Sequence, residues 1–349
     1  MLKLLIHAGM PKAGSTALQA RLKARRPSLR KSGILYPTKT QNHNFLMAGA
    51  VPIGSLPRIF RQHYRNDKAA LRRDFDEFWD QILRQIENTS PEIVVMSGEN
   101  LWTLDDEGAE RLRQRLGTIS DDIHVVCYVR RPSDFYLSAA QQKIKASHVL
   151  PKAAGVKYRR HLEAMARLGA QLHVHAYARG GFIEGDVCLD FAERHLGNRE
   201  HLAASPEDLS QNESLSAEAM AILQDYRAHA HSENDTRFTK DTNVLIRELR
   251  ALSSNDRPSL RPEIRQFVDN SSVDLNWLRD TYDVVFSDID YGQIRESDPK
   301  EVSAVADICP VDEIKKTAIL NTVLQRWLSE HASGEAKFRT VFKGKAAKG

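Results

Sequence analysis

A glycine-flanked loop near the N-terminus has the residue types that bind a phosphate or sulfate group. The segment Gly9-Met10-Pro11-Lys12-Ala13-Gly14-Ser15-Thr16 follows an apolar run and precedes a helical pattern. At the start of a helix, backbone N–H groups point toward a common position, and the helix dipole adds partial positive charge. Lys12 would add a full charge there, and Ser15 and Thr16 would add hydroxyl donors. The loop is therefore predicted to hold an anion.

The order of residues in this loop differs from that of an ATP-binding loop. A Walker A loop has a lysine directly after its second glycine, followed by serine or threonine. Here Ser15 follows Gly14, and Lys12 lies two residues earlier. A kinase that uses ATP with magnesium is therefore an alternative that the spacing disfavours. A plain strand-to-helix turn with a surface lysine is the alternative without a ligand.

A second candidate anion site follows the apolar segment 124–129. Arg130-Arg131-Pro132 ends that segment, and Ser138 lies eight residues after Arg130, on the helix that Pro132 is expected to begin. A strand-end arginine and a hydroxyl on the next helix can meet above the carboxyl edge of a parallel sheet, where open α/β sheets bind ligands. Two anion sites on neighbouring strands suit a nucleotide that carries phosphate at both ends of its ribose.

These two motifs resemble the nucleotide-binding motifs of the sulfotransferases that use 3′-phosphoadenosine 5′-phosphosulfate (PAPS). Pro11-Lys12-Ala13-Gly14-Ser15-Thr16 is similar to the family's 5′-phosphosulfate loop. Tyr128-Val129-Arg130-Arg131-Pro132, with Ser138, is similar to its 3′-phosphate motif. The order and separation of the two motifs also match, and the resemblance covers residues 1–200, including the segment 185–191.

The resemblance implies a role for each residue of the two motifs. Lys12 would contact the bridging oxygen and the 5′-phosphate, and Gly14, Ser15 and Thr16 would cradle that group, with Ala13 in the same nucleotide-binding loop. Arg130 with Ser138 would hold the 3′-phosphate. Ala17 stands where many cytosolic members have a tryptophan, so the chain looks closer to the bacterial and carbohydrate-modifying branches. The family's basic loop near the C-terminus has no clear match.

A candidate for that C-terminal loop is Lys343-Gly344-Lys345. The activity implied by the resemblance is transfer of a sulfuryl group from PAPS to a hydroxyl or amine of a small molecule or saccharide, with PAP as the product nucleotide. The sequence identifies neither the acceptor nor the oligomeric state.

Sulfuryl transfer also needs in-line positioning, charge neutralisation on the leaving phosphate and a base for the acceptor's proton. Glu99 follows the apolar segment 93–96, and the family places its catalytic Glu or His at this strand end. Glu99 is therefore the first candidate base, with capping of the next segment as its structural alternative. The second candidate is His43, in a polar loop after Pro37, which could instead be a loop residue or an acceptor contact.

The elements that must position these residues alternate between strand and helix in the first half of the chain. Strands are expected at 2–8, 34–36, 93–96, 123–129 and 172–177, and helices at 15–25, 68–86, 106–116, from 132, 158–168 and 187–196. Apolar runs without alternation are typical of strands covered on both faces. We expect an α/β fold with a doubly wound parallel sheet flanked by helices. The resemblance implies the P-loop nucleotide-hydrolase-like sulfotransferase fold.

The same reading predicts one domain with a helical extension. Residues 1–200 would form the PAPS-binding core, and residues 201–349 would form a mainly helical extension or cap packed on that core. The stretch 253–265, rich in Ser, Pro and Arg, is expected to be an exposed loop.

Charge and composition limit the other functions. The 349 residues carry a net charge of +4, yet no carboxylate side chain precedes Asp67, and residues 1–66 hold twelve lysines and arginines. This basic block suggests an anion site, a nucleic-acid surface or a solvated helix face. Few aromatic residues lie between the basic ones, so a nucleic-acid-binding module ranks last.

Membrane spans and metal sites are not predicted. No apolar run approaches the roughly 18 residues of a spanning helix, and the N-terminus lacks a secretory pattern, so we expect a cytoplasmic protein. Cys127, Cys188 and Cys309 lie far apart, and the pair His173 and His175 has no ligand companion at a suitable spacing.

Overall fold

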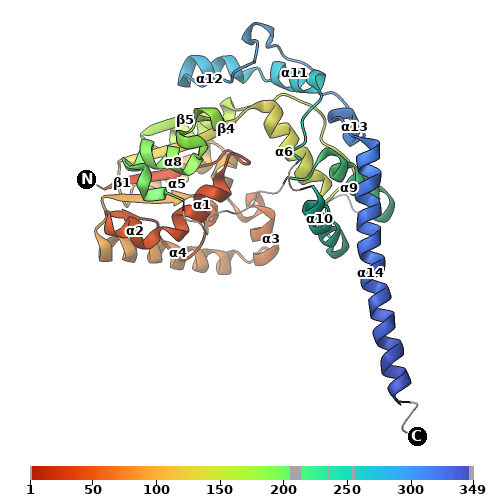
Figure 1. The fold of residues 1–349 in the computed structure, drawn as a ribbon. Helices are drawn as coiled ribbons and strands as arrows, with labels where there is room; N and C mark the ends of the chain where they lie inside the picture. Colours follow the sequence, from red (N-terminus) through yellow and green to blue (C-terminus); the bar gives the residue numbers. More distant parts are fainter. Residues whose placement is uncertain (1, 205–213, 234–235, 254–255, 346–349) are drawn as a thin grey trace. The chain divides into compact units, whose positions relative to one another are not determined.

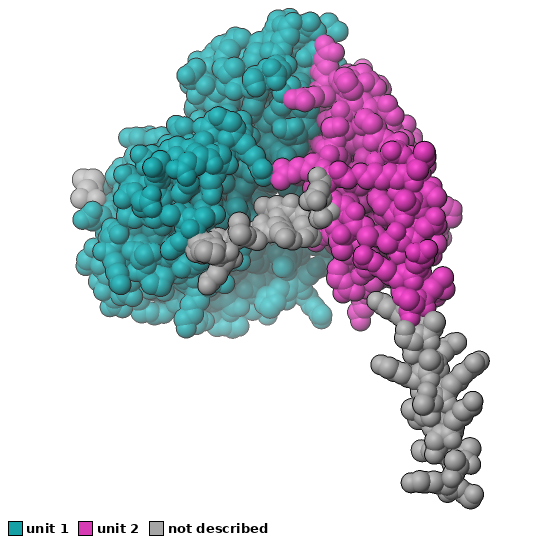
Figure 2. Space-filling model, viewed as in Figure 1, with its two compact units in different colours: residues 1–135, 155–210, 269–297 teal, residues 136–154, 211–268, 298–349 magenta. Residues whose placement is uncertain are grey.

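The computed structural model describes residues 2–204, 214–233, 236–253 and 256–345, with side chains described up to residue 329. The chain forms two compact units, and each is built from segments that are separate in sequence (Figure 2). We call residues 1–135, 155–210 and 269–297 the α/β unit, and residues 136–154, 211–268 and 298–349 the helical unit. These boundaries differ from a single boundary near residue 200.

Five parallel strands form the central sheet of the α/β unit, in the order β2-β3-β1-β4-β5. Their bounds are Lys3–His7 for β1, Ile34–Leu35 for β2, Ile93–Ser97 for β3, Ile123–Arg130 for β4 and Gln171–Tyr177 for β5. β1 lies at the centre, with Leu5 paired to Val95 of β3 and Ile6 paired to Val125 of β4. The predicted α/β class with a parallel central sheet is confirmed.

Helices cover both faces of this sheet (Figure 1). Their bounds are Ser15–Ala24 for α1, Arg26–Lys31 for α2, Arg58–Tyr64 for α3, Lys68–Thr89 for α4, Asp106–Leu116 for α5, Arg159–Leu168 for α7, Val187–Phe191 for α8 and Asp274–Tyr282 for α12. The connection from β1 to β2 and the connection from β3 to β4 run in opposite directions across the sheet, so right-handed crossovers place α1 and α5 on opposite faces. Consistently, α1 packs against α8, and α5 packs against α7.

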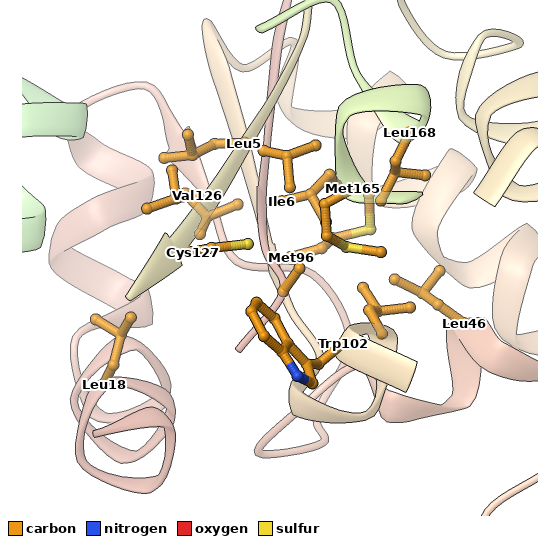
Figure 3. Close-up of a cluster of buried hydrophobic side chains, with 14 of the residues drawn as sticks. Leu5, Ile6, Leu18, Leu46, Met96, Trp102, Val126, Cys127, Met165 and Leu168 are labelled. Atoms are coloured by element: carbon orange, nitrogen blue, oxygen red, sulfur yellow. The ribbon is translucent and has the colours of Figure 1, made fainter. Parts of the chain in front are cut away.

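The core of the α/β unit fixes the strands that end at the candidate site. Leu5, Ile6, Met96, Val126 and Cys127 are fully buried, and Figure 3 shows them with side chains from the covering helices. Burial of one such aliphatic side chain contributes about 1.5–3 kcal/mol. The carboxyl ends of β1, β3 and β4 are therefore held in one rigid layer.

A buried ion pair connects the start of residues 269–297 to the end of β4 in the α/β unit. Asp269 is 2% exposed, and its Oδ2 accepts from Nε of Arg131 at 2.9 Å and from Oγ of Ser133 at 3.0 Å. Its Oδ1 accepts from the main-chain N–H of Ser133 at 2.9 Å. Arg131 also donates to the carbonyl oxygen of Ser287 at 3.0 Å. Residues far beyond position 200 thus complete the surroundings of the β4 end.

The helical unit has its own apolar core. Its helices are α6 (Pro132–Ile144), which begins in the α/β unit, α9 (Ala217–Ala230), α10 (Lys240–Leu252), α11 (Pro262–Asn270), which ends in the α/β unit, α13 (Val305–Ile308) and α14 (Glu313–Lys345). Arg227 is fully buried there and donates to the carbonyl oxygen of Ala146 at 2.6 Å. The expected loop at 253–265 is shorter than predicted, because α11 begins at Pro262. Among the described residues, no helix is long and apolar enough to cross a membrane.

Candidate functional site

Three strands of the sheet end side by side below the candidate site. His7 at the end of β1 pairs with Ser97 of β3 and with Val126 of β4. Loop 8–14, the turn before Glu99 and the end of β4 therefore leave the sheet at the same carboxyl edge. This is the edge at which open α/β sheets bind ligands.

The glycine-flanked loop continues the pairing of β1 with β4 before it turns into α1. Met10 N–H donates to the carbonyl oxygen of Tyr128 at 2.9 Å, and Tyr128 N–H donates to the carbonyl oxygen of Gly9 at 3.0 Å. Gly14 then precedes α1 with a left-handed backbone, φ 82°. A Cβ atom on Gly14 would lie 2.7 Å from Cε2 of Tyr177. Gly14 is thus required by both its backbone angle and the approach of Tyr177.

The start of α1 has the features of an anion site. Its first-turn N–H groups have no intrahelical partner, and no acidic residue lies in that turn. Ser15 is 2% exposed, and its Oγ has no hydrogen-bond partner in the part of the chain that the structure describes. Thr16 is exposed and Ala13 is buried. A buried hydroxyl without a partner costs stability, so Ser15 fits a ligand oxygen at this position.

Arg130, the last residue of β4, is joined to the loop. Its Nη1 donates to the carbonyl oxygen of Lys12 at 2.9 Å, and its guanidinium lies 5.8 Å from the ring centroid of Tyr177. Its own carbonyl oxygen accepts from the hydroxyl of Tyr158 at 2.6 Å. The two predicted anion motifs therefore meet at Lys12 and Arg130. Ser138 lies half-buried on α6 in the helical unit, and its part in the site stays a prediction.

Glu99 belongs to the same electrostatic group. It is the half-buried first residue of the 3₁₀ helix η3 (Glu99–Thr103). Burial lowers the pKa of Lys12 below its ordinary value, the carboxylate of Glu99 raises it, and the guanidinium of Arg130 lowers it further. The ammonium of Lys12 thus interacts electrostatically with one carboxylate, that of Glu99, and one cation, the guanidinium of Arg130. A bound dianion would favour its charged form and so raise its pKa.

His43 is held in the interior of the α/β unit. It is fully buried, its Nδ1 accepts from the main-chain N–H of Ser97 at 3.1 Å, and its Nε2 lies 2.9 Å from the carbonyl oxygen of Pro37. Because Nδ1 is an acceptor, Nε2 carries the proton and donates to Pro37. Burial lowers the pKa of His43 to about 4. Both ring nitrogens are occupied, so the geometry disfavours His43 as the base.

The sequence reasoning missed a buried network directly below the site. The hydroxyl oxygen of Ser97 lies 2.8 Å from Nδ1 of His7 and accepts from Nε2 of Gln19 at 3.0 Å. Burial lowers the pKa of His7 to about 4. These residues come from three separate elements, and no local motif in the sequence connects them. In the sequence, the signal for this network is His7, a polar residue at the end of the apolar run of β1.

Arginines of the basic block have structural partners. Nη1 of Arg21 donates to Oδ2 of Asp186 at 2.7 Å, which joins α1 to the start of α8. Arg25 donates to the carbonyl oxygen of Ala203 at 2.7 Å, and Arg26 donates to that of Tyr36 at 3.1 Å. The interpretation of these side chains as a solvated helix face is therefore wrong for these three arginines.

Both histidines of β5, His173 and His175, lie within hydrogen-bonding distance of another histidine. Nδ1 of His124 lies 3.0 Å from Nε2 of His173, and Nε2 of His175 lies 3.0 Å from Nε2 of His195. Among the described residues, no group of three or more His, Cys, Asp or Glu side chains could hold a metal ion. Cys127, Cys188 and Cys309 are buried, and none of them forms a disulfide bond among the described residues. The side chains of Lys343-Gly344-Lys345 lie outside the described residues.

In comparisons with known proteins, no family model, no curated protein and no solved structure matches the chain. The functional assignment therefore depends on the residues of this chain and on their geometry.

Proposed function

We propose that the chain is a sulfotransferase that moves a sulfuryl group from PAPS to a hydroxyl or amine of a carbohydrate or glycoconjugate. The observation that carries the proposal is the grouping of Lys12, Arg130 and Glu99 beside the start of α1. Two cations and a helix N-terminus suit a donor that has anionic groups at both ends of its ribose. A neighbouring carboxylate suits the proton transfer from the acceptor.

Each side chain has a defined task in this proposal. Glu99 accepts the proton of the acceptor, and the ammonium of Lys12 neutralises the charge that develops on the leaving 5′-phosphate. The hydroxyl of Ser15 and the N–H groups of the first turn of α1 hold the 5′ group. Arg130 holds the 3′-phosphate. Gly14 and Ala13 keep the loop close enough for these contacts.

The nucleotide site is tested by calorimetric titration with PAP. Lys12→Ala and Arg130→Ala are each expected to weaken binding by about tenfold or more, which corresponds to about 1.4 kcal/mol. Lys23→Ala is the matched control, because Lys23 is exposed near the other end of α1 and its removal changes the net charge equally. Absence of PAP binding by the wild-type chain would refute the proposal.

A titration with ATP and magnesium tests the kinase alternative on the same samples. The lysine spacing of the loop predicts that ATP with magnesium binds more weakly than PAP. Tighter, magnesium-dependent binding of ATP would favour the kinase instead.

The role of Glu99 is tested with labelled PAPS and a panel of sugars, lipids and peptides as acceptors. Glu99→Gln is expected to lower kcat by about 10²-fold or more, in keeping with the usual contribution of a general base, while PAP affinity is retained. Glu92→Gln is the control, because Glu92 is exposed just before β3. Full turnover by Glu99→Gln would remove Glu99 as the base.

A further inference from the structure

Ser97, the last residue of β3, is tied to three other elements by hydrogen bonds. Its N–H donates to Nδ1 of His43 at 3.1 Å, and its carbonyl oxygen accepts from the N–H of His43 at 2.6 Å. Its hydroxyl contacts His7 at the end of β1 and Gln19 on α1. Ser97 and His43 are both fully buried, so water does not compete for these bonds.

The turn that carries Glu99 begins at Ser97. The next residue, Gly98, donates its N–H to the carbonyl oxygen of His7 at 2.9 Å. A Cβ atom on Gly98 would lie 3.2 Å from the carbonyl oxygen of His43. The main chain that leads to Glu99 is thus enclosed between β1 and the loop of His43.

We infer that His43 is a positioning residue, whose imidazole fixes the main chain of Ser97 and thereby sets the carboxylate of Glu99 against the ammonium of Lys12. An imidazole suits this task because it has an acceptor at one end and a donor at the other. Nδ1 holds β3, while Nε2 donates to Pro37 and so anchors the loop 37–43 to the same strand. The ring is held edge-on by Tyr36, with 4.7 Å between the ring centroids.

The effect of His43 on catalysis rests on the proposed function. Its effect on the pKa of Lys12, through the position of the Glu99 carboxylate, does not. This effect is measurable because Glu99 raises the pKa of Lys12. Any displacement of the carboxylate away from Lys12 should lower that pKa, with or without a nucleotide.

The effect on the pKa of Lys12 is tested by ¹³C NMR titration of reductively methylated lysines, with the Lys12 signal assigned from Lys12→Arg. Glu99→Gln is expected to lower the pKa of Lys12 and sets the size of the full effect. His43→Gln, which lacks an acceptor at the Nδ1 position, is expected to shift it in the same direction. His43→Asn, whose Oδ1 can replace Nδ1, is expected to stay closer to the wild type.

The control variant lies in the same loop. Thr40 is exposed and its Oγ1 donates to the carbonyl oxygen of Asn42 at 2.8 Å, so Thr40→Val disturbs the loop without touching Ser97. This variant is expected to leave the Lys12 signal unchanged. A Lys12 pKa that responds to Glu99→Gln but not to His43→Gln would overturn the inference.

A measurement on the wild-type chain covers the case in which the His43 variants do not fold. Long-range ¹H–¹⁵N spectra are expected to show Nδ1 of His43 without a proton and Nε2 with one, from pH 8 to pH 5.5 and after addition of PAP. A His43 ring that takes up a proton in this range would overturn the inference.

Kinetics separate positioning from catalysis. With PAPS and an acceptor, His43→Gln is expected to lower kcat by about tenfold, a typical loss when a catalytic group is misplaced, without changing PAP affinity or the acid limb of the pH–rate profile. Loss of that limb in His43→Gln would make His43 the base and would overturn the inference. If the pKa of Lys12 responds to His43→Gln but no acceptor receives a sulfuryl group, the proposed function is refuted. The positioning role of His43 would then remain in place.

Discussion

The guanidinium of Arg130 donates a hydrogen bond of 2.9 Å to the main-chain oxygen of Lys12. This bond connects the end of β4 to the loop that follows β1, so one contact within the α/β unit holds Arg130 next to Lys12. A ligand that spans both sites would meet donors that are already in place. Such preorganisation lowers the entropy that binding must overcome.

Arg130→Lys tests whether the shape of the guanidinium matters as well as its charge. Lysine keeps the charge but lacks the planar fork that can reach Lys12 and an anion together. We expect PAP affinity to fall by about tenfold, or about 1.4 kcal/mol, in calorimetric titrations. Arg167→Lys is the control, since Arg167 is half exposed and pairs with Asp106 on the surface. Equal affinity in both variants would show that charge alone suffices.

Gly14→Ala tests the shape of the loop. A methyl group there meets the ring of Tyr177 at 2.7 Å and is attached to a backbone with φ 82°. We expect the free energy of unfolding to fall by about 1–3 kcal/mol, measured by urea denaturation, because both strains act on one residue. Gly54→Ala should have little effect, since no atom lies within 4 Å of its added methyl group. Equal stability of the two variants would contradict the assigned geometry.

We predict that the free energy of unfolding falls in acid, because burial lowers the pKa of several histidines. Burial lowers the pKa of His7, His43 and His175 to about 4, below their ordinary value of 6.5. Between these values the unfolded chain binds more protons, so this contribution is complete above pH 6.5 and is lost as the pH falls toward 4. Each such proton changes the free energy of unfolding by about 1.4 kcal/mol per pH unit.

Urea denaturation at a series of pH values measures this loss. His175→Gln is expected to reduce the slope of stability against pH, because one of the titrating groups with a lowered pKa is removed. His63→Gln serves as the control, since His63 is exposed. If the free energy of unfolding of the wild-type chain did not change between pH 6.5 and pH 4.5, the conclusion that these histidines are uncharged in the folded state would be contradicted.

Asp269→Asn tests the buried ion pair at the end of β4. Removal of the charge leaves Arg131, only 8% exposed, without its counterion. Loss of one partner of a buried pair typically destabilises by about 3–5 kcal/mol, and we expect the lower part of that range because the amide still accepts one bond. Asp280→Asn is the surface control, as Asp280 pairs with its neighbour Arg279 in an exposed position. Equal urea midpoints for the two variants would argue against the pair.

The parallel sheet and its carboxyl edge could be predicted because apolar strand runs and glycine turns are local signals. The same signals placed Lys12, Glu99 and Arg130 at one edge. The contact between His43 and Ser97 could not be predicted, because it joins residues 54 positions apart through a buried main-chain bond. Helix 187–196 was predicted as one element, but its second half, Ala192–Leu196, is a π-helix in which His195 reaches His175. Spacing in the sequence does not distinguish an α-turn from a π-turn.

The α/β unit is completed late in synthesis. Asp269, the counterion of Arg131, is translated after most of the helical unit, although it binds next to the end of β4. A nascent chain that has just passed residue 200 therefore contains every strand of the sheet and still lacks the carboxylate that neutralises Arg131. The helices between residues 211 and 268 must leave the ribosome before the sheet reaches its final stability. A fragment cut near residue 200 would lack Asp269 permanently and would leave the guanidinium of Arg131 without its counterion.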